Sequence, residues 1–304
     1  MYEVLAQMAG LILCGIFWRI KQPMGLAADD VRIRLTSLVY NMLLPALVLL
    51  VLWRAPLGLD VVKIAIVAAA GVLMGMLLGR IIYGWMNVPA AVAGAMIIAS
   101  GFPNATYLGL PVLEATLGEW SRSVAVQYDL FACTPLLLTV GMMVGAAYGD
   151  GEKEQHPLYA MLKVPPLWAA IAALALNAAA IPMPSVIEGW LSMMAGAVIP
   201  LMLIALGMGL RWESFTLSSL PIMAPVVVIQ LILMPILVLW LSQQLGLEGE
   251  LLAAVVLEAA MPCMVLGLVI CDRFKLDTAL YASVVTLTTG LSMISLPIWF
   301  DILI

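Results

Sequence analysis

The sequence contains very little charge for its length. Of its 304 residues, 10% are charged and 64% are hydrophobic, and there is a single histidine. A water-soluble domain needs a polar surface around its core, so this composition excludes a soluble globular protein. The formal net charge of −5 is spread over short connections, which gives no reason to expect a nucleic-acid partner.

The sequence also lacks the motifs of ATP-driven and cofactor-dependent proteins. It has no Walker sequence, no nucleotide-binding glycine loop and no His or Cys cluster with metal-ligand spacing. Its four cysteines fall within or at the ends of apolar runs, so they predict neither a disulfide framework nor a zinc site. We therefore expect no cofactor, no metal and no enzymatic activity.

Apolar runs of about 20 residues recur along the chain, and this is the length that crosses about 30 Å of hydrocarbon as an α-helix. They lack the polar alternation of β-barrel strands. The predicted fold class is an all-α polytopic membrane protein with ten transmembrane helices. The first run has no basic region before it and is expected to remain as an anchor. The predicted spans are residues 4–20, 31–53, 60–84, 88–117, 119–148, 164–182, 186–210, 217–245, 249–272 and 276–303.

A hydrophilic connection divides these spans into two sets of five. Prolines recur at matching places in the two sets: Pro45 and Pro200 are 155 residues apart, and Pro103 and Pro262 are 159 residues apart. Because five is odd, a duplicated five-helix unit must insert with the opposite orientation, which gives the inverted-repeat architecture of many secondary transporters. The predicted divisions are an N-terminal repeat over 1–148, a cytoplasmic connecting loop over 149–163 and a C-terminal repeat over 164–304.

Lysine and arginine are distributed unevenly between the two sides of the predicted bundle. Basic loops are retained in the cytoplasm, so the distribution predicts that both termini lie outside the cell. We expect a multi-pass protein of the bacterial inner membrane, with the lipid bilayer as its surroundings. One side holds Arg19, Lys21, Arg32, Arg34, Arg80, Lys153, Lys163, Arg211, Arg273 and Lys275, and the other holds Arg54, Lys63 and Arg122.

Pro103 and Pro262 interrupt spans that otherwise read as continuous helix. Proline removes a backbone hydrogen bond, so each helix is expected to open near the middle of the membrane. Opened backbone is tolerated only against protein or a wet cavity, and the second half of each helix would begin with free N–H groups that favour an anion. We expect a carboxylate substrate to bind where the two interruptions meet. The alternative is that both prolines only kink their helices.

Uncharged polar residues within the spans either face the predicted cavity or join helices by hydrogen bonds. Asn41 lies one turn before Pro45 and is placed in the predicted site, whereas Gln230, Thr288 and the neighbouring threonines are expected to join helices by hydrogen bonds. The predicted substrate-binding residues are Asn41, Pro103, Asn104, Thr106, Pro262 and Cys263.

Two carboxyl side chains are predicted to lie near the middle of the membrane. Asp129 is about 10 residues into the fifth span and Glu258 about 9 into the ninth. Ionisable groups at this depth are costly and indicate function. Our hypothesis is that one of the two couples transport to protons; the alternative is that both are static polar contacts in a wet cleft.

The stretch from Pro103-Asn104-Ala105-Thr106 to Gly109-Leu110-Pro111 closely resembles the fourth-helix motif of the auxin efflux carrier family, which includes the plant PIN carriers and bacterial organic-acid permeases. The last two spans and the surroundings of Pro200 also resemble this family, so the resemblance covers essentially the whole chain. It implies ten helices, a fold shared with bile acid sodium symporters, and a crossing of helices four and nine at their prolines. It also implies an elevator-like movement of helices 3 to 5 and 8 to 10 against helices 1, 2, 6 and 7, often in a homodimer.

The resemblance implies a secondary active transporter of small organic anions such as auxin or dicarboxylates. The sequence departs from the family pattern at two places. Helix six begins with Val164-Pro165-Pro166 where members often have Asn-Pro, and Glu258 stands near a glutamine of the plant carriers. Two alternatives stay open: a membrane receptor or sensor for organic acids that does not translocate them, and a sodium-coupled carrier of the same fold. The expected coupling ion is a proton or sodium.

Overall fold

The computed structural model describes residues 2–56, 58–151, 161–211 and 217–304, and every regular element in these ranges is a helix. Seven helices in this part are long and apolar enough to cross a membrane, and two apolar helices are shorter. The chain is therefore an all-helical polytopic membrane protein. The seven are Glu3–Lys21, Ala28–Leu52, Leu59–Trp85, Glu119–Tyr148, Ser185–Gly209, Leu220–Gln244 and Thr278–Leu303, and the shorter two are Ala90–Gly101 and Pro165–Ala178.

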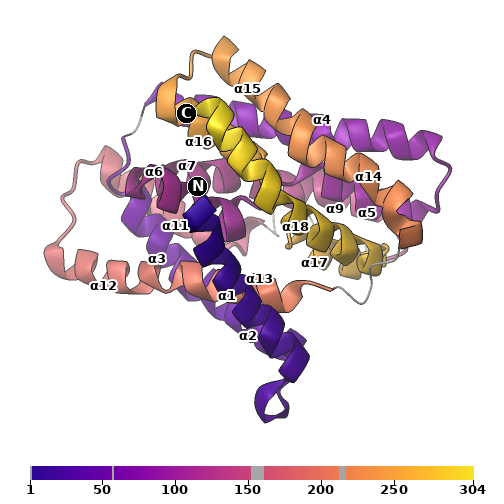
Figure 1. The fold of residues 1–304 in the computed structure, drawn as a ribbon. Helices are drawn as coiled ribbons and strands as arrows, with labels where there is room; N and C mark the ends of the chain where they lie inside the picture. Colours follow the sequence, from indigo (N-terminus) through magenta and orange to yellow (C-terminus); the bar gives the residue numbers. More distant parts are fainter. Residues whose placement is uncertain (1, 57, 152–160, 212–216) are drawn as a thin grey trace.

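The helices follow the chain in the order shown in Figure 1. The first half contains α1 (Tyr2–Lys21), α2 (Ala28–Leu38), α3 (Leu44–Leu52), α4 (Leu59–Trp85), α5 (Ala90–Gly101), α6 (Leu110–Leu117), α7 (Arg122–Tyr128), α8 (Thr134–Leu136) and α9 (Met142–Tyr148). The second half contains α11 (Pro165–Ala178), α12 (Ser185–Gly196), α13 (Val198–Gly209), α14 (Leu220–Val228), α15 (Met234–Gln244), α16 (Gly249–Ala259), α17 (Gly267–Arg273) and α18 (Thr278–Leu303). Most of the predicted connecting loop, residues 152–160 with His156 among them, lies outside the described residues.

Five π-helical turns lie in the described ranges, and four of these turns end one residue before an X-Pro pair. Proline has no N–H to donate, and its ring crowds the preceding turn. The residue before the proline then reaches back five positions, as Leu44 N–H does to the Val39 carbonyl ahead of Pro45. The five turns are Val39–Leu43, Ala105–Gly109, Asp129–Cys133, Leu137–Gly141 and Ile229–Leu233.

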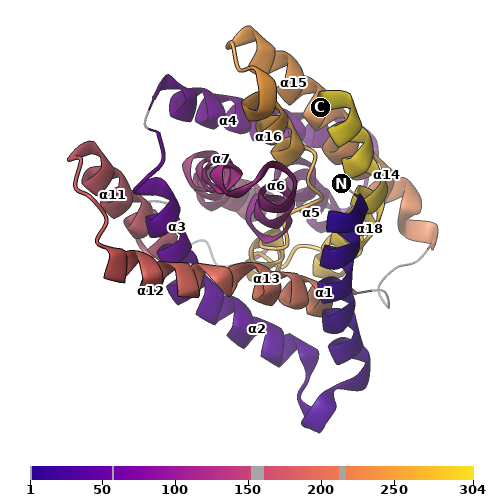
Figure 2. The ribbon, with the colours of Figure 1, turned by 60° about the vertical axis from the view of Figure 1, so that its left-hand side comes forward.

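The helices form two groups by their contacts. In one group α1 packs on α13, and α3 packs on α11 and α12; in the other, α4 packs on α5 and α15, and α15 packs on α16. Glycine permits the close approach of α1 and α13, because a Cβ on Gly15 of α1 or Gly207 of α13 would collide with the backbone of the opposing helix. Figure 2 shows α6 and α7 in the middle of the molecule, with α1, α3, α4, α13 and α18 around them. The two helices that follow the Pro103 interruption are therefore internal.

Candidate functional site

Two interruptions of helical structure meet at the centre of the molecule. Helix α5 ends at Gly101, Phe102 is extended (φ −107°, ψ 108°), and helical structure resumes at Ala105. Helix α16 ends at Ala259, and α17 begins at Gly267. Asn104 N–H donates to the Pro262 carbonyl at 2.8 Å, and Met264 N–H donates to the Phe102 carbonyl at 2.8 Å. The two chain segments therefore pair like a minimal antiparallel ribbon, with Pro103 opposite Cys263.

Side chains from neighbouring helices complete the hydrogen bonding of the second interruption. Cys263 N–H donates to Thr288 Oγ1 at 3.2 Å, and Gln230 Nε2 donates to the Met261 carbonyl at 3.2 Å. The Tyr281 hydroxyl donates to the Met264 carbonyl at 2.8 Å. Gln230 and Thr288 thus join helices, as the sequence predicted. Backbone N–H and carbonyl groups around Pro262 that are not bonded within a helix are hydrogen-bonded to other parts of the protein. Such bonding is the condition for non-helical chain inside a membrane.

A small cavity, the central cavity, adjoins the paired segments. Its volume is about 30 Å³, enough for one or two water molecules. Asn104 and Thr106 from the first interruption line it, and the buried Nδ2 of Asn104 has no hydrogen-bond partner within the described part of the chain. An amide donor in this position is available to an acceptor in the cavity. The lining is Tyr40, Leu44, Asn104, Thr106, Tyr107, Asp129, Thr134, Met264 and Leu266.

The carboxyl group of Asp129 lies in this same lining. Thr106 Oγ1 donates a hydrogen bond to Asp129 Oδ2, and Thr134 Oγ1 donates to Asp129 Oδ1 at 3.1 Å. Both carboxyl oxygens therefore act as acceptors. The structure brings Thr106 and Asp129 together, although the sequence assigned one to substrate binding and the other to coupling. Each lies in a π-helical turn, a deviation often found at functional sites.

Glu258 lies apart from the central cavity. Its side chain is fully buried, and neither carboxyl oxygen has a hydrogen-bond partner in the described residues. It packs against Gly109, where a Cβ atom would collide with both carboxyl oxygens. Pro103, Pro262 and Cys263 are also buried and do not line the cavity. These three residues shape the backbone of the site and present no side chain to the space within it.

Asn41 is the predicted substrate-binding residue whose side chain lies away from both the central cavity and the paired segments. Its side chain is exposed, and its Nδ2 donates to the Ser37 carbonyl at 2.8 Å and to Ser37 Oγ at 3.2 Å. Tyr40 and Leu44 line the cavity from this helix, one turn apart on one face. Sequence reasoning missed them because it chose the residue by polarity; helical spacing back from Leu44 would have pointed to Tyr40.

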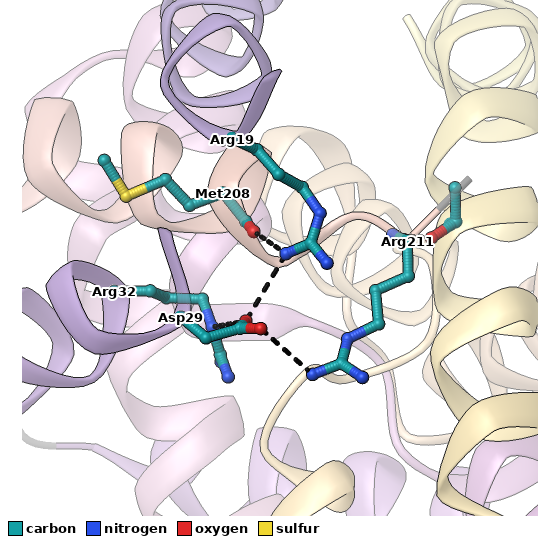
Figure 3. Close-up of polar contacts among 6 residues, drawn as sticks. Arg19, Asp29, Arg32, Met208 and Arg211 are labelled. Carbon is teal, nitrogen blue, oxygen red and sulfur yellow. Dashed lines mark hydrogen bonds and ion pairs between the residues drawn. The ribbon is translucent and has the colours of Figure 1, made fainter. Parts of the chain in front are cut away.

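A larger cavity, the vestibule, shares Tyr40, Tyr107 and Leu266 with the central cavity and therefore adjoins it. The vestibule has a volume of about 510 Å³. Its wall includes Asp29 and two of the three arginines that surround this carboxylate in Figure 3. The sequence counted these arginines only as indicators of membrane orientation. Its lining is Asp29, Arg32, Ile33, Thr36, Ser37, Tyr40, Tyr107, Arg211, Val265, Leu266, Leu268, Val269, Asp272 and Thr278.

The chain is similar in sequence to proteins that are named as transporters. The family described as membrane transport protein matches residues 1–300 of the chain. An uncharacterized transporter of Methanothermobacter thermautotrophicus is 28% identical over 99% of this chain and 98% of its own length. An uncharacterized transporter of Methanocaldococcus jannaschii is 28% identical over 69% of this chain and 68% of its own. The uncharacterized transporter YfdV of Escherichia coli is 23% identical over 71% and 70%. The chain thus belongs to the membrane transport protein family, which is the auxin efflux carrier family that its Pro103 motif resembles.

Proposed function

We propose that this protein is a secondary active transporter of small organic anions, with carboxylates as its substrates. The observation that carries the proposal is the unpartnered amide nitrogen of Asn104 beside a cavity at paired helix interruptions. The helical run that starts at Ala105 directs its positive end toward this region, which favours a negative charge. An apolar bundle with an open donor and a helix start at its centre is suited to an anion that has left water.

The arrangement of the cavity lining supports alternating access. Tyr40 and Leu44 belong to the group formed by α1–α3 and α11–α13, whereas Asn104, Thr106, Asp129 and Met264 belong to the group formed by α4–α9 and α14–α18. A ligand at this border touches both groups, so sliding of one group against the other would carry it between the two sides of the membrane. We propose ten membrane-crossing segments in two inverted repeats, an elevator movement of the second group against the first, and a homodimer held by the first group.

The charge of the cavity supports proton coupling. The central cavity, at about 30 Å³, must widen to admit a carboxylate, which movement of one helix group against the other would allow. An anion beside the Asp129 carboxylate would then bring two negative charges together where the repulsion is poorly screened. Binding of a proton to Asp129 removes this repulsion and links the two events thermodynamically. Glu258 has no such contact with the cavity. We therefore assign the coupling role to Asp129 and regard Glu258 as a packing residue.

The test is uptake of radiolabelled dicarboxylates and aromatic monocarboxylates into proteoliposomes, with pH and sodium gradients imposed separately. Accumulation driven by an inward proton gradient and reduced by Asn104→Ala is the expected result. Ligand binding that raises the melting temperature without any flux would favour the receptor or sensor alternative. Accumulation driven by sodium alone would identify the sodium-coupled carrier. The absence of both binding and flux for every acid in the series would refute the proposal.

A further inference from the structure

Three guanidinium groups surround one carboxylate at the vestibule. Arg19 Nη1 lies 3.4 Å from Asp29 Oδ1, Arg211 Nη2 lies 3.3 Å from Asp29 Oδ2, and Arg32 Nε lies 3.7 Å from Asp29 Oδ1. Figure 3 shows the arginines converging on Asp29 from three directions. Asp272, at the end of α17, is the other acid in the vestibule lining and is exposed. The three arginines and the two carboxylates of Asp29 and Asp272 together carry a formal net charge of +1.

The carboxylate of Asp29 does not use the full binding capacity of these arginines. A bidentate arginine–carboxylate pair has N···O distances of about 2.7 to 2.9 Å, and all three distances here are longer. Arg32 Nε is buried, and it donates no hydrogen bond within the described part of the chain. The contact of Arg32 Nε with Asp29 Oδ1 at 3.7 Å is therefore an ion pair without a hydrogen bond. Because the Arg32 side chain lines a cavity of about 510 Å³, displacement of Asp29 would free its guanidinium for another acceptor.

We propose that Arg32 and Arg211 form a carboxylate-binding site in the vestibule, with Asp29 as a tethered competitor for the same two guanidinium groups. An incoming carboxylate displaces Asp29, binds the two arginines, and moves on past Tyr40 and Tyr107 to the central cavity. The inference deepens the proposed function and rests on it, because it adds a second position on the route of the same anions. The competing interpretation is a structural ion-pair cluster that only braces α1, α2 and the segment after α13.

The direct test is arginine labelling of the wild-type protein in nanodiscs with phenylglyoxal, followed by peptide mass spectrometry, with and without succinate. Succinate is expected to slow labelling of Arg32 and Arg211 by about tenfold, compared with sodium chloride at equal ionic strength. Arg54 is the matched control, because it does not line the vestibule and its Nη2 lies 2.5 Å from Glu188 Oε2. Equal labelling of Arg32 and Arg211 with and without succinate would overturn the proposal.

Variants separate competition from bracing. Asp29→Asn removes the competing carboxylate while preserving shape, so succinate should protect Arg32 and Arg211 at concentrations about tenfold lower. A bracing cluster predicts instead a lower melting temperature with no change in the protecting concentration. Arg32→Gln should weaken protection of Arg211, and Arg32→Lys, which keeps the charge, should restore part of it. Loss of protection in both wild type and Asp29→Asn would refute the proposal.

The vestibule proposal and the proposed transport function can be refuted separately. Protection of the vestibule arginines is expected to persist in Asn104→Ala, because the central cavity is a separate site. If vestibule protection is absent but Asn104→Ala still abolishes uptake, the vestibule inference is wrong and the transport proposal stands. If vestibule protection is present and no acid is transported, the transport proposal is wrong and the vestibule binds anions for another purpose.

Discussion

The backbone N–H of Asn104 donates to the carbonyl of Pro262 at 2.8 Å, while the side-chain nitrogen of the same residue has no partner in the described residues. The backbone of Asn104 thus serves the fold, and its side chain is left for another use. Substituting the side chain leaves the backbone bond in place. Function and stability are therefore separable at this residue, which makes it the most informative position for mutagenesis.

Asn104→Ala is expected to weaken substrate affinity by about tenfold or more, because one hydrogen bond to a charged ligand is lost. Its melting temperature should stay close to that of wild type. Asn177→Ala is the matched control: Asn177 Nδ2 donates to the carbonyls of Leu52 at 2.9 Å and Ala55 at 2.7 Å, so its loss should cost about 1 to 2 kcal/mol of stability without changing affinity. Proteoliposome uptake and thermal unfolding measure the two effects. The reverse pattern would remove Asn104 from the site.

Asp129→Asn and Glu258→Gln should differ in their effect on the pH dependence of uptake. If Asp129 binds the coupling proton, wild-type affinity for the anion increases as pH falls, and an amide at this position makes affinity independent of pH. Glu258→Gln retains the pH dependence, since Glu258 does not line the cavity. Initial uptake rates between pH 5 and 8 at several substrate concentrations are the measurement. A flat profile in Glu258→Gln with an unchanged one in Asp129→Asn would exchange the two roles.

Gly109→Ala is expected to destabilise the protein by about 1 to 3 kcal/mol, because the added methyl group would overlap the buried carboxyl group of Glu258. Combining it with Glu258→Ala should recover part of this loss, since the second substitution removes the overlapping atoms. Gly290→Ala is the control, with no atom within 4 Å of the added Cβ. Thermal unfolding of the single and double variants measures these changes in stability. If the changes of the two single variants simply add in the double variant, Gly109 and Glu258 are not in direct contact.

The membrane orientation is tested by cysteine labelling in a Cys14→Ala background, because Cys14 is the exposed native cysteine of the described residues. Ser185 and Ala27 are both exposed, and they lie at opposite sides by the predicted topology. A membrane-impermeant maleimide should label Ser185→Cys on intact cells and Ala27→Cys only after permeabilisation, because the lysine and arginine excess is on the side of Ala27. The opposite accessibility would invert the topology.

The sequence predicted the breaks in α5–α6 and α16–α17 because proline has a local effect on backbone that requires no knowledge of neighbours. It also placed Asn104 and Thr106 in one short stretch, and both line the central cavity. The pairing of Asn104 with Pro262 was expected only as a meeting of two interruptions. Its hydrogen bonds depend on the relative depth of two helices, which no local pattern encodes.

The contact between Thr106 and Asp129 and the cluster around Asp29 were not predicted. Both join residues on different helices, and their formation depends on helix rotation within the bundle. Asn41 shows the same limit. Its polarity and its position before Pro45 suggested the cavity, but the face of a helix that turns inward is set by packing against other helices, and Tyr40 lines the cavity in its place.

The pairing of Phe102 and Asn104 with Met264 and Pro262 has a consequence for biosynthesis. The first interruption is synthesised about 160 residues before the second. At ~5 to 20 residues per second, the ribosome needs about 8 to 30 s to synthesise the chain between them. Throughout that interval the Phe102 carbonyl and the Asn104 N–H lack their final partners. A nascent N-terminal half must therefore be sheltered by the insertion machinery or by water, and a chain truncated before Pro262 is expected to be degraded rather than to accumulate in the membrane.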